Sequence, residues 1–360
     1  MAKNGTLNFA KVAGNDEFYT QYNDIQQEVN AYLEYDSDTF RDKTVLLPCD
    51  DPDWSKFTRF FMENFNYFGL KKLISTSYAH ASKNVHFAWR PTELEINSPN
   101  FNPEKSRTHG KVFTLDRETH SRQHIDINNL EWHYLEDTGD FRSEEVVALR
   151  DEADIIVTNP PFSLFREFVS WIFEGQKKFL IIGNKNAITY KEIFTLIKAN
   201  KLWVGVTSMS KDLHFFIPKY YIDSIKESNR LTAIAMEGGN ILGRSPAVWF
   251  TNLEHGRRHE PLQLMTMKEN IKYSRHKDIR GTDYKCYDNY NAIDIPFIDA
   301  IPSDYEKIMG VPITFLDKYC PEQFEIIGLD RYVDDNPFYG HRFTINGKES
   351  YARILIRKIN

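Results

Sequence analysis

Short apolar runs alternate along the chain with segments whose apolar residues recur at helical spacing. In residues 23–35, Ile25, Val29 and Tyr32 lie three or four positions apart, which predicts an amphipathic helix. A second helix is predicted from Ser55 to Phe65. The apolar runs have the length of buried strands and lie at 44–49, 71–78, 154–158, 178–183, 202–207 and 247–251. Strands that alternate with helices predict an α/β fold with a doubly wound sheet.

Two stretches depart from this alternation. Residues 80–133 hold six of the eleven histidines, which lie among scattered Asn, Ser and Pro residues, and predict an insertion. Residues 255–310 are irregular, polar and locally basic. The tail contains further apolar runs that predict strands of a smaller C-terminal lobe, at 310–316, 323–329 and 351–358. We expect a main domain over 1–253 and a separate C-terminal region over 254–360.

The composition is that of a folded protein. The chain has 360 residues, a length greater than one ordinary domain needs. Of these residues, 41% are hydrophobic. Its three cysteines form no CxxC pair, so neither a disulfide framework nor a structural zinc site is predicted, and a reducing cytoplasm fits. No stretch approaches the roughly 20 apolar residues of a membrane span, so we expect a cytoplasmic protein that is not membrane-embedded.

The most specific chemical motif is Asn159-Pro160-Pro161-Phe162, which follows the apolar run at 154–158 and precedes a predicted helix. In an open α/β sheet, ligands bind outside the carboxyl ends of the strands, where this motif falls. The Asn159 side-chain oxygen and the Pro160 carbonyl can accept the hydrogens of a ring amino group such as adenine N6, which frees its lone pair. The two prolines stiffen the loop, and Phe162 offers a face on which a base can stack.

A structural interpretation of this motif is the alternative. Any x-Pro-Pro sequence interrupts regular structure, so the motif could end a strand while Phe162 packs in the core. Its position between a strand and a helix favours the functional interpretation.

NPPF after a strand resembles the catalytic motif of S-adenosylmethionine-dependent amino-methyltransferases. The wider set of motifs is similar to that of the EcoRI-type adenine-specific DNA methyltransferases, from residue 16 to the C-terminus. These motifs are DEFYTQY (16–22), CDDPDWSKF (49–57), TNPPFSLF (158–165), ITYKEIF (188–194), WFTNL (249–253), YDNYNAI (287–293) and MGVPITFL (309–316). The resemblance implies a Rossmann-like sheet of the class I methyltransferase type, with a catalytic domain at 1–253 and a DNA-contacting lobe at 254–360.

The resemblance also implies that S-adenosyl-L-methionine is the cofactor. Phe18, Tyr19 and Thr20 match an FYT element that packs over the cofactor, although Thr20 or Asn23 could instead be a helix N-cap. After the second predicted strand, no residue of KKLISTSYAH is a clear ligand for the cofactor ribose.

Two further elements are implied to bind the cofactor. Asp50 and Asp51 follow the first predicted strand, where a carboxylate can hold the methionine ammonium. Most methyltransferases have glycines at this point; this chain has none, and the EcoRI-type subset shares the departure. Asp140 and Phe141 match a GDF element whose acid accepts from the cofactor adenine, with a surface turn as the alternative.

These features predict site-specific DNA adenine N6-methylation, in which the target base leaves the duplex. Phe215 or Phe216 offers a second stacking face, unless both belong to the core. No metal or covalent enzyme intermediate is expected, since the sulfonium is already an activated donor. The alternatives are an N-methyltransferase of RNA or of protein glutamine, a cytosine-N4 enzyme, and a non-catalytic DNA-binding module with a degenerate cofactor site.

The charge distribution changes the first impression that the net charge gives. A formal charge of −6 argues against a nucleic-acid partner. Residues 257–285, however, hold eight basic and four acidic residues, a local +4 that leaves −10 on the rest of the chain. We expect salt-sensitive DNA contacts here, with a solvated loop as the alternative. The expected DNA-binding residues are Arg257, Arg258, Lys268, Lys272, Arg275, Lys277 and Arg280.

Double-stranded DNA is the expected partner of the protein. A cognate restriction endonuclease is a further expected partner, and a monomer is the favoured oligomeric state.

Overall fold

The computed structural model of the protein describes residues 19–50, 55–79, 91, 93–120, 125, 131–217, 236–237, 240–333 and 340–359. The chain divides into two compact units. The first comprises Met1–Lys185 and Lys211–Leu253, and the second comprises Asn186–Ser210 and Glu254–Asn360. The segment Asn186–Ser210 therefore groups with the C-terminal part of the chain.

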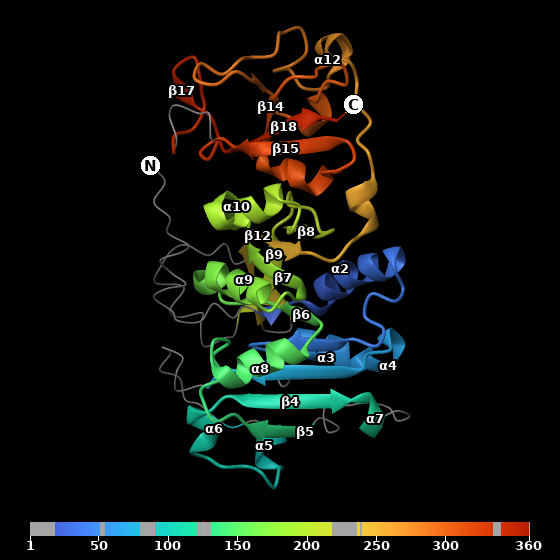
Figure 1. Ribbon diagram of the computed structural model, residues 1–360, viewed down its shortest axis with the longest axis vertical. Coiled ribbons are helices and arrows are strands. Elements are labelled where there is room, and N and C mark those ends of the chain that lie inside the picture. Colours follow the sequence, from blue (N-terminus) through green and yellow to red (C-terminus); the bar gives the residue numbers. More distant parts are fainter. Residues whose placement is uncertain are drawn as a thin grey trace. The chain divides into compact units, whose positions relative to one another are not determined.

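A mixed sheet forms the centre of the first unit (Figure 1). Its strands are β2 (Thr44–Leu47), β3 (Lys72–Ser77), β4 (Lys111–Asp116), β5 (Glu131–Tyr134), β6 (Ile155–Thr158), β7 (Lys178–Asn184) and β12 (Ala247–Thr251). They lie in the order β5-β4-β3-β2-β6-β7-β12. The pairs β3-β2, β2-β6 and β6-β7 are parallel, whereas β4, β5 and β12 pair antiparallel with their neighbours. The predicted insertion at 80–133 thus contributes two strands to the sheet.

Helices pack on both faces of this sheet. In the first unit they are α2 (Tyr22–Tyr35), α3 (Lys56–Glu63), α4 (Phe65–Phe68), α5 (Glu93–Ile96), α6 (Lys105–Thr108), α7 (Arg117–His120), α8 (Glu144–Glu152), η3 (Phe162–Leu164) and α9 (Phe165–Glu174). Apolar residues of α2 and α3 share a core with Leu180 and Trp249. Phe179 and Phe250, the sequence neighbours of Leu180 and Trp249, point to the opposite face of the sheet. On that face, the ring centroid of Phe165 of α9 lies 5.0 Å from that of Phe250, and the ring centroid of Phe173 lies 5.8 Å from that of Phe179. The predicted α/β class is confirmed.

A second, antiparallel sheet of the first unit has the order β1-β9-β11-β10. Its strands are β1 (Tyr19–Thr20), β9 (Leu213–Ile217), β10 (Met236–Glu237) and β11 (Asn240–Ser245). This sheet joins the beginning of the described chain to a segment almost 200 positions away, because Thr20 pairs with Phe215.

The second unit contains a sheet of order β13-β14-β18-β15. Its strands are β13 (Ile293–Asp294), β14 (Met309–Pro312), β15 (Phe324–Leu329) and β18 (Arg353–Lys358). The other strands are β8 (Trp203–Val204), β16 (Thr344–Ile345) and β17 (Lys348–Glu349). The helices are α10 (Lys191–Lys198), η5 (Gly256–His259), α12 (Met267–Tyr273), η6 (Ile298–Ala300) and η7 (Ile313–Lys318), and η4 (Lys185–Thr189) leads into the unit. The three tail strands predicted from the sequence are present.

Several predicted boundaries are wrong by a few residues. The strand predicted over 44–49 ends at Leu47, because Pro48 and Cys49 form a turn and Cys49 has a φ of 70°. The strand predicted over 310–316 ends at Pro312, and η7 follows it. Proline has no N–H to continue a strand ladder, which explains the change at that residue.

Candidate functional site

The carboxyl ends of β2, β3 and β6 lie at one edge of the mixed sheet. The three strands are parallel, so the loops that begin at residues 48, 78 and 159 leave the sheet at the same edge. The loop at 137–141 joins them, because the Ala79 N–H donates to the Thr138 carbonyl oxygen at 2.7 Å. Four loops that are distant in sequence therefore meet there.

The Asn-Pro-Pro-Phe motif leads from β6 into η3 and α9, as the sequence predicts. Asn159 is 8% exposed, and Pro160 is also buried. Pro161 has a φ of −54° and a ψ of 121° and is followed at once by the 3-10 turn, in which the Leu164 N–H donates to the Pro161 carbonyl at 3.0 Å. Phe162 is half-buried and packs against the core.

Hydroxyl groups surround Asp50 at the end of β2. Its carboxylate accepts hydrogen bonds from Ser55 Oγ and from Thr158 Oγ1, each at 2.6 Å. Its backbone carbonyl accepts from Thr58 Oγ1 at 3.0 Å and from Ser75 Oγ. Asp50 is 7% exposed, so this carboxylate is held inside the loop rather than displayed on the surface. Asp51, the other acid predicted here, lies outside the described residues.

Asp140 is held by the arginine two positions later. Arg142 Nε donates to Oδ1 at 2.9 Å and Nη2 to Oδ2 at 2.7 Å, which is a bidentate ion pair. These hydrogen bonds lower the pKa of Asp140. Arg142 also donates to Glu167 of α9 at 3.0 Å, so the loop is tied to the helix that follows the Asn-Pro-Pro-Phe motif. The Ser143 N–H donates to the Asp140 carbonyl, so the residue also begins a turn, as the alternative interpretation expected.

The neighbours of Asp140 are fixed by packing. Phe141 is 3% exposed and contacts Phe168 and Trp171 of α9, with ring centroids 5.1 and 5.6 Å away. Gly139 has a φ of 81°, and a Cβ on it would overlap the Ser77 carbonyl oxygen at the end of β3.

The N-terminal FYT element is described in part. Phe18 and the side chain of Tyr19 lie outside the described residues, whereas Thr20 is 3% exposed. The alternative that Thr20 or Asn23 caps the helix is wrong, because the N-cap residue of α2 is Gln21. Of the two candidate stacking residues on β9, Phe215 is 1% exposed and belongs to the core. The side chain of Phe216 lies outside the described residues.

The seven basic residues that are expected to bind DNA fall into two groups. The exposed ones are Lys268, Lys272, Arg275, Lys277 and Arg280. Arg275 pairs with Asp299 at 2.9 Å but keeps 79% of its side chain exposed. Arg257 is half-buried and donates to the Val206 carbonyl oxygen. Arg258 is 4% exposed.

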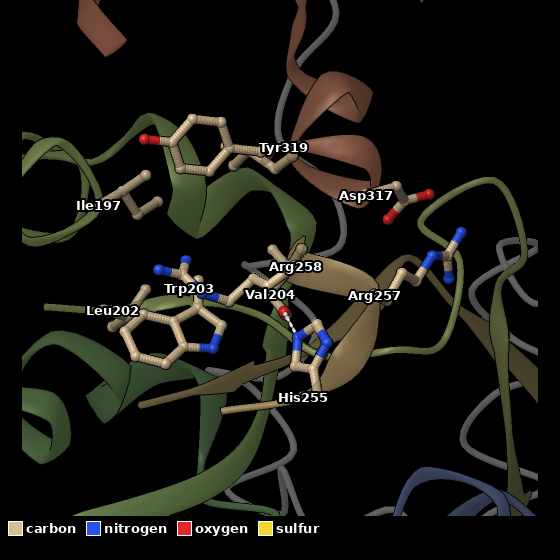
Figure 2. A pocket seen from close by; sticks show the side chains of 11 residues that line it. Ile197, Leu202, Trp203, Val204, His255, Arg257, Arg258, Asp317 and Tyr319 are labelled. Carbon is tan, nitrogen blue, oxygen red and sulfur yellow. Dashed lines mark hydrogen bonds between the residues drawn. The ribbon is translucent and has the colours of Figure 1, made fainter. Parts of the chain in front are cut away.

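Arg258 belongs to the packed lining of a small pocket in the second unit. Its guanidinium carbon lies 3.8 Å from the Trp203 ring centroid, and its nitrogens contact Glu254 at 3.1 Å and Asn200 at 2.7 Å. Figure 2 shows His255 in the same lining, bonded through Nε2 to the Val204 carbonyl at 3.1 Å. Burial lowers the pKa of His255 to about 4, so the ring is neutral at pH 7. The contacts of Arg258 leave it no free face toward solvent.

The hydroxyl groups at the sheet edge were not predicted from the sequence. Ser55, Thr58, Ser75 and Thr158 all bond to the Asp50 turn. A polar residue at the end of an otherwise apolar run, as in IIVT at 155–158, is the sequence pattern that could have indicated these hydroxyl groups. Arg142, the partner of Asp140, was also missed.

In the part of the chain that the structure describes, no helix combines the length and apolar character that a membrane crossing requires. The same residues contain no group of three or more His, Cys, Asp or Glu side chains arranged to hold a metal ion.

Comparison with known proteins identifies the family. The family described as "Adenine-specific methyltransferase EcoRI" matches residues 6–359. The chain is 40% identical to the Type II methyltransferase M.EcoRI of Escherichia coli, over 99% of this chain and 98% of that protein. It is 34% identical to M.MgeORF184P of Mycoplasma genitalium and 32% identical to M.MpnI of Mycoplasma pneumoniae, each over 98% of both chains. No solved structure matches. The chain therefore belongs to the EcoRI family of adenine-specific methyltransferases.

Proposed function

We propose that this protein is a site-specific DNA methyltransferase, which transfers a methyl group from S-adenosyl-L-methionine to N6 of an adenine flipped out of duplex DNA. The family is adenine-specific, and the relatives are named Type II methyltransferases. One observation carries the assignment of the site. The Thr158 hydroxyl, one residue before Asn159, lies 2.6 Å from the Asp50 carboxylate and so joins the expected catalytic loop to the expected cofactor loop.

We also propose that the mixed sheet is a Rossmann-like sheet of the class I methyltransferase type. Its parallel centre, β3-β2-β6-β7, is followed by the antiparallel strand β12, and helices pack on both faces. The loops that hold Asp50, Asp140 and Asn159 all lie at one edge, which is where open α/β sheets bind ligands.

The catalytic step depends on acceptors that are already in place. The Asn159 side-chain oxygen and the Pro160 carbonyl accept the two N6 hydrogens, which makes the nitrogen lone pair available to the methyl group. Burial strengthens these hydrogen bonds, and the rigid Pro160-Pro161 pair holds them before the base arrives. The ring of the half-buried Phe162 stacks on the flipped base and offsets part of the cost of unstacking it.

Polar groups of the first unit fit the cofactor. Thr20 Oγ1 is buried and has no hydrogen-bond partner among the described residues, so it can bond to a polar group of a ligand. Asp50 and Asp140 supply carboxylates for an ammonium and an amino group. Phe18, Tyr19, Asp51 and Phe141 complete the proposed set. When bound, the cofactor supplies an activated sulfonium methyl, and the protein residues orient it toward the base.

Five exposed basic side chains between residues 268 and 280 form the proposed DNA-contacting surface. These residues are Lys268, Lys272, Arg275, Lys277 and Arg280, to which the half-buried Arg257 adds a partly accessible charge. We leave Arg258 out of this set because Glu254, Asn200 and Trp203 already surround its guanidinium. We further propose a monomer in the cytoplasm and a cognate endonuclease that cuts the same DNA site.

Labelled methyl transfer to duplex DNA, RNA and protein, assayed in parallel, tests the function. We expect transfer to duplex DNA, with N6-methyladenine as the methylated nucleoside. Asn159→Ala should abolish transfer while calorimetry still detects cofactor binding, and Asn66→Ala, an exposed position on α4, is the control. Full activity of Asn159→Ala would refute the role of that residue, and a methylcytosine product would refute the base assignment.

A further inference from the structure

Thr158 occupies the junction between the two loops of the proposed site. It is 0% exposed, and its hydroxyl oxygen lies 2.6 Å from the Pro48 carbonyl oxygen and 2.6 Å from Asp50 Oδ2. A threonine hydroxyl has one hydrogen to donate, so these two acceptors share it. The next peptide bond leads to Asn159, so this hydroxyl lies one residue from the Asn-Pro-Pro-Phe loop.

The other side of Asp50 is fixed by a different element. Ser55 Oγ donates to Asp50 Oδ1 at 2.6 Å, and the same oxygen accepts from the Phe57 N–H at 3.1 Å as the N-cap of α3. Asp50 is thus tied to α3 through one carboxylate oxygen and to β6 through the other. The bond from Thr158 links this carboxylate to the strand that carries Asn159.

We propose that Thr158 is a positioning residue for methyl transfer: its hydroxyl holds the Pro48–Asp50 turn and the Asn159 loop in one relative geometry. The inference rests on the proposed function, in which Asp50 contacts the cofactor and Asn159 contacts the target amino group. Transfer needs the donor and the amine in line, and small displacements are costly because proximity supplies much of the rate. The branched Cβ of threonine also restricts χ1, which keeps the hydroxyl directed at its acceptors.

A matched buried threonine separates this role from simple packing. Thr251 of β12 is also 0% exposed, and its hydroxyl donates to the Phe179 carbonyl at 2.7 Å. It belongs to the same unit and the same sheet. Its register partner Leu180 lies near the beginning of β7, whereas the proposed site lies at the carboxyl ends of the strands. Thr251→Val therefore removes a comparable buried hydroxyl without touching either loop.

The test compares Thr158→Val, Thr158→Ser and Thr251→Val in the full-length protein. Calorimetry with S-adenosylhomocysteine measures cofactor-site affinity, steady-state assays give kcat and KM for duplex DNA, and thermal unfolding gives stability. We expect Thr158→Val to weaken the calorimetric affinity by roughly tenfold, the effect of losing one hydrogen bond to a charged group. Its kcat should fall while KM for DNA changes little. Thr158→Ser should restore most of both values, and Thr251→Val should lower stability alone.

A double-mutant cycle tests whether Thr158 acts through Asp50. Asp50→Asn and Thr158→Val each remove the same hydrogen bond. The double variant should therefore lose less affinity for S-adenosylhomocysteine than the product of the two single-variant fold-changes. The proposal is overturned if Thr158→Val loses stability to the same degree as Thr251→Val but keeps wild-type affinity and kcat. Failure of the proposed function gives a different result, because the unmodified protein would then bind no cofactor and methylate no DNA.

Discussion

Gly139 gives the sharpest quantitative test of how the sheet edge is built. Its φ of 81° lies in the left-handed region, and a Cβ there would lie 3.1 Å from Gly110 Cα and overlap the Ser77 carbonyl oxygen. Both neighbours are backbone atoms, which cannot rotate away as a side chain can. Gly139→Ala should therefore shift the loop that holds Asp140, or force the end of β3 to move.

The expected loss of stability has two parts. An L-residue in the left-handed conformation costs about 1–2 kcal/mol, and steric overlap in a well-packed region costs about 1–3 kcal/mol more. Gly139→Ala should thus lower the free energy of unfolding by about 2–5 kcal/mol. Gly69→Ala is the control in the same unit: Gly69 has a φ of 64°, and the nearest atom to its added Cβ is the flexible Arg41 side chain at 3.3 Å. It should lose only the first part.

Urea-induced unfolding of both variants measures the difference, and calorimetry with S-adenosylhomocysteine reports the function of the loop. The entropy lost by the unfolded chain on replacing glycine with alanine is the same in both variants and cancels in the comparison. Gly139→Ala should be less stable than Gly69→Ala by at least about 1 kcal/mol and should bind the cofactor analogue more weakly. Equal stabilities would show that the overlap with Ser77 is relieved without cost, and the reasoning would fail.

Two further predictions concern pH and salt. Burial depresses the pKa of His255 to about 4. The unfolded chain therefore binds a proton near pH 6.5, whereas the folded chain takes it up only near pH 4. The free energy of unfolding should fall as the pH falls through this window, by at most about 3 kcal/mol. His255→Gln, which keeps a donor for the Val204 carbonyl, should flatten this dependence in urea titrations at pH 5 and 7.5, and an unchanged slope would contradict it. Lys268→Gln and Lys272→Gln should each reduce the slope of log affinity for duplex DNA against log salt by about one. Lys348→Gln, exposed but outside the basic segment, should leave it unchanged, and an equal effect of all three would contradict a defined surface.

Most of the sheet could be predicted from the sequence because its strands are nearly continuous apolar runs. β2, β3, β6 and β12 lie within predicted runs, and β7 extends one residue beyond its run. β4 and β5 could not be found in the same way, because polar residues interrupt their apolar positions, as in KVFTLD at 111–116 and in the edge strand EWHY at 131–134. The pairing of Thr20 with Phe215 was also hidden, since no local pattern reports a contact between such distant segments.

The sequence predicts the part of the site in which a short motif carries the chemistry. It predicts less well the residues whose role depends on a network of tertiary contacts. Asn159 to Phe162 form a recognisable motif, and the structure places them between a strand and a helix as expected. Arg258, in contrast, has the same sequence signature as its exposed basic neighbours. Only tertiary packing shows that Trp203, Glu254 and Asn200 enclose it.

The turn that lacks glycine shows how such a network can replace a residue type. Cys49 has a φ of 70°, a conformation that glycine adopts freely and that costs other residues about 1–2 kcal/mol. Side-chain hydroxyls bond to three successive backbone positions there: Thr158 to the Pro48 carbonyl, Thr76 to the Cys49 N–H, and Thr58 to the Asp50 carbonyl. Each bond favours the turn as it stands, and together they can offset the strain. The missing glycine is therefore no argument against a formed loop, because hydroxyl groups from neighbouring elements fix the same kind of backbone shape.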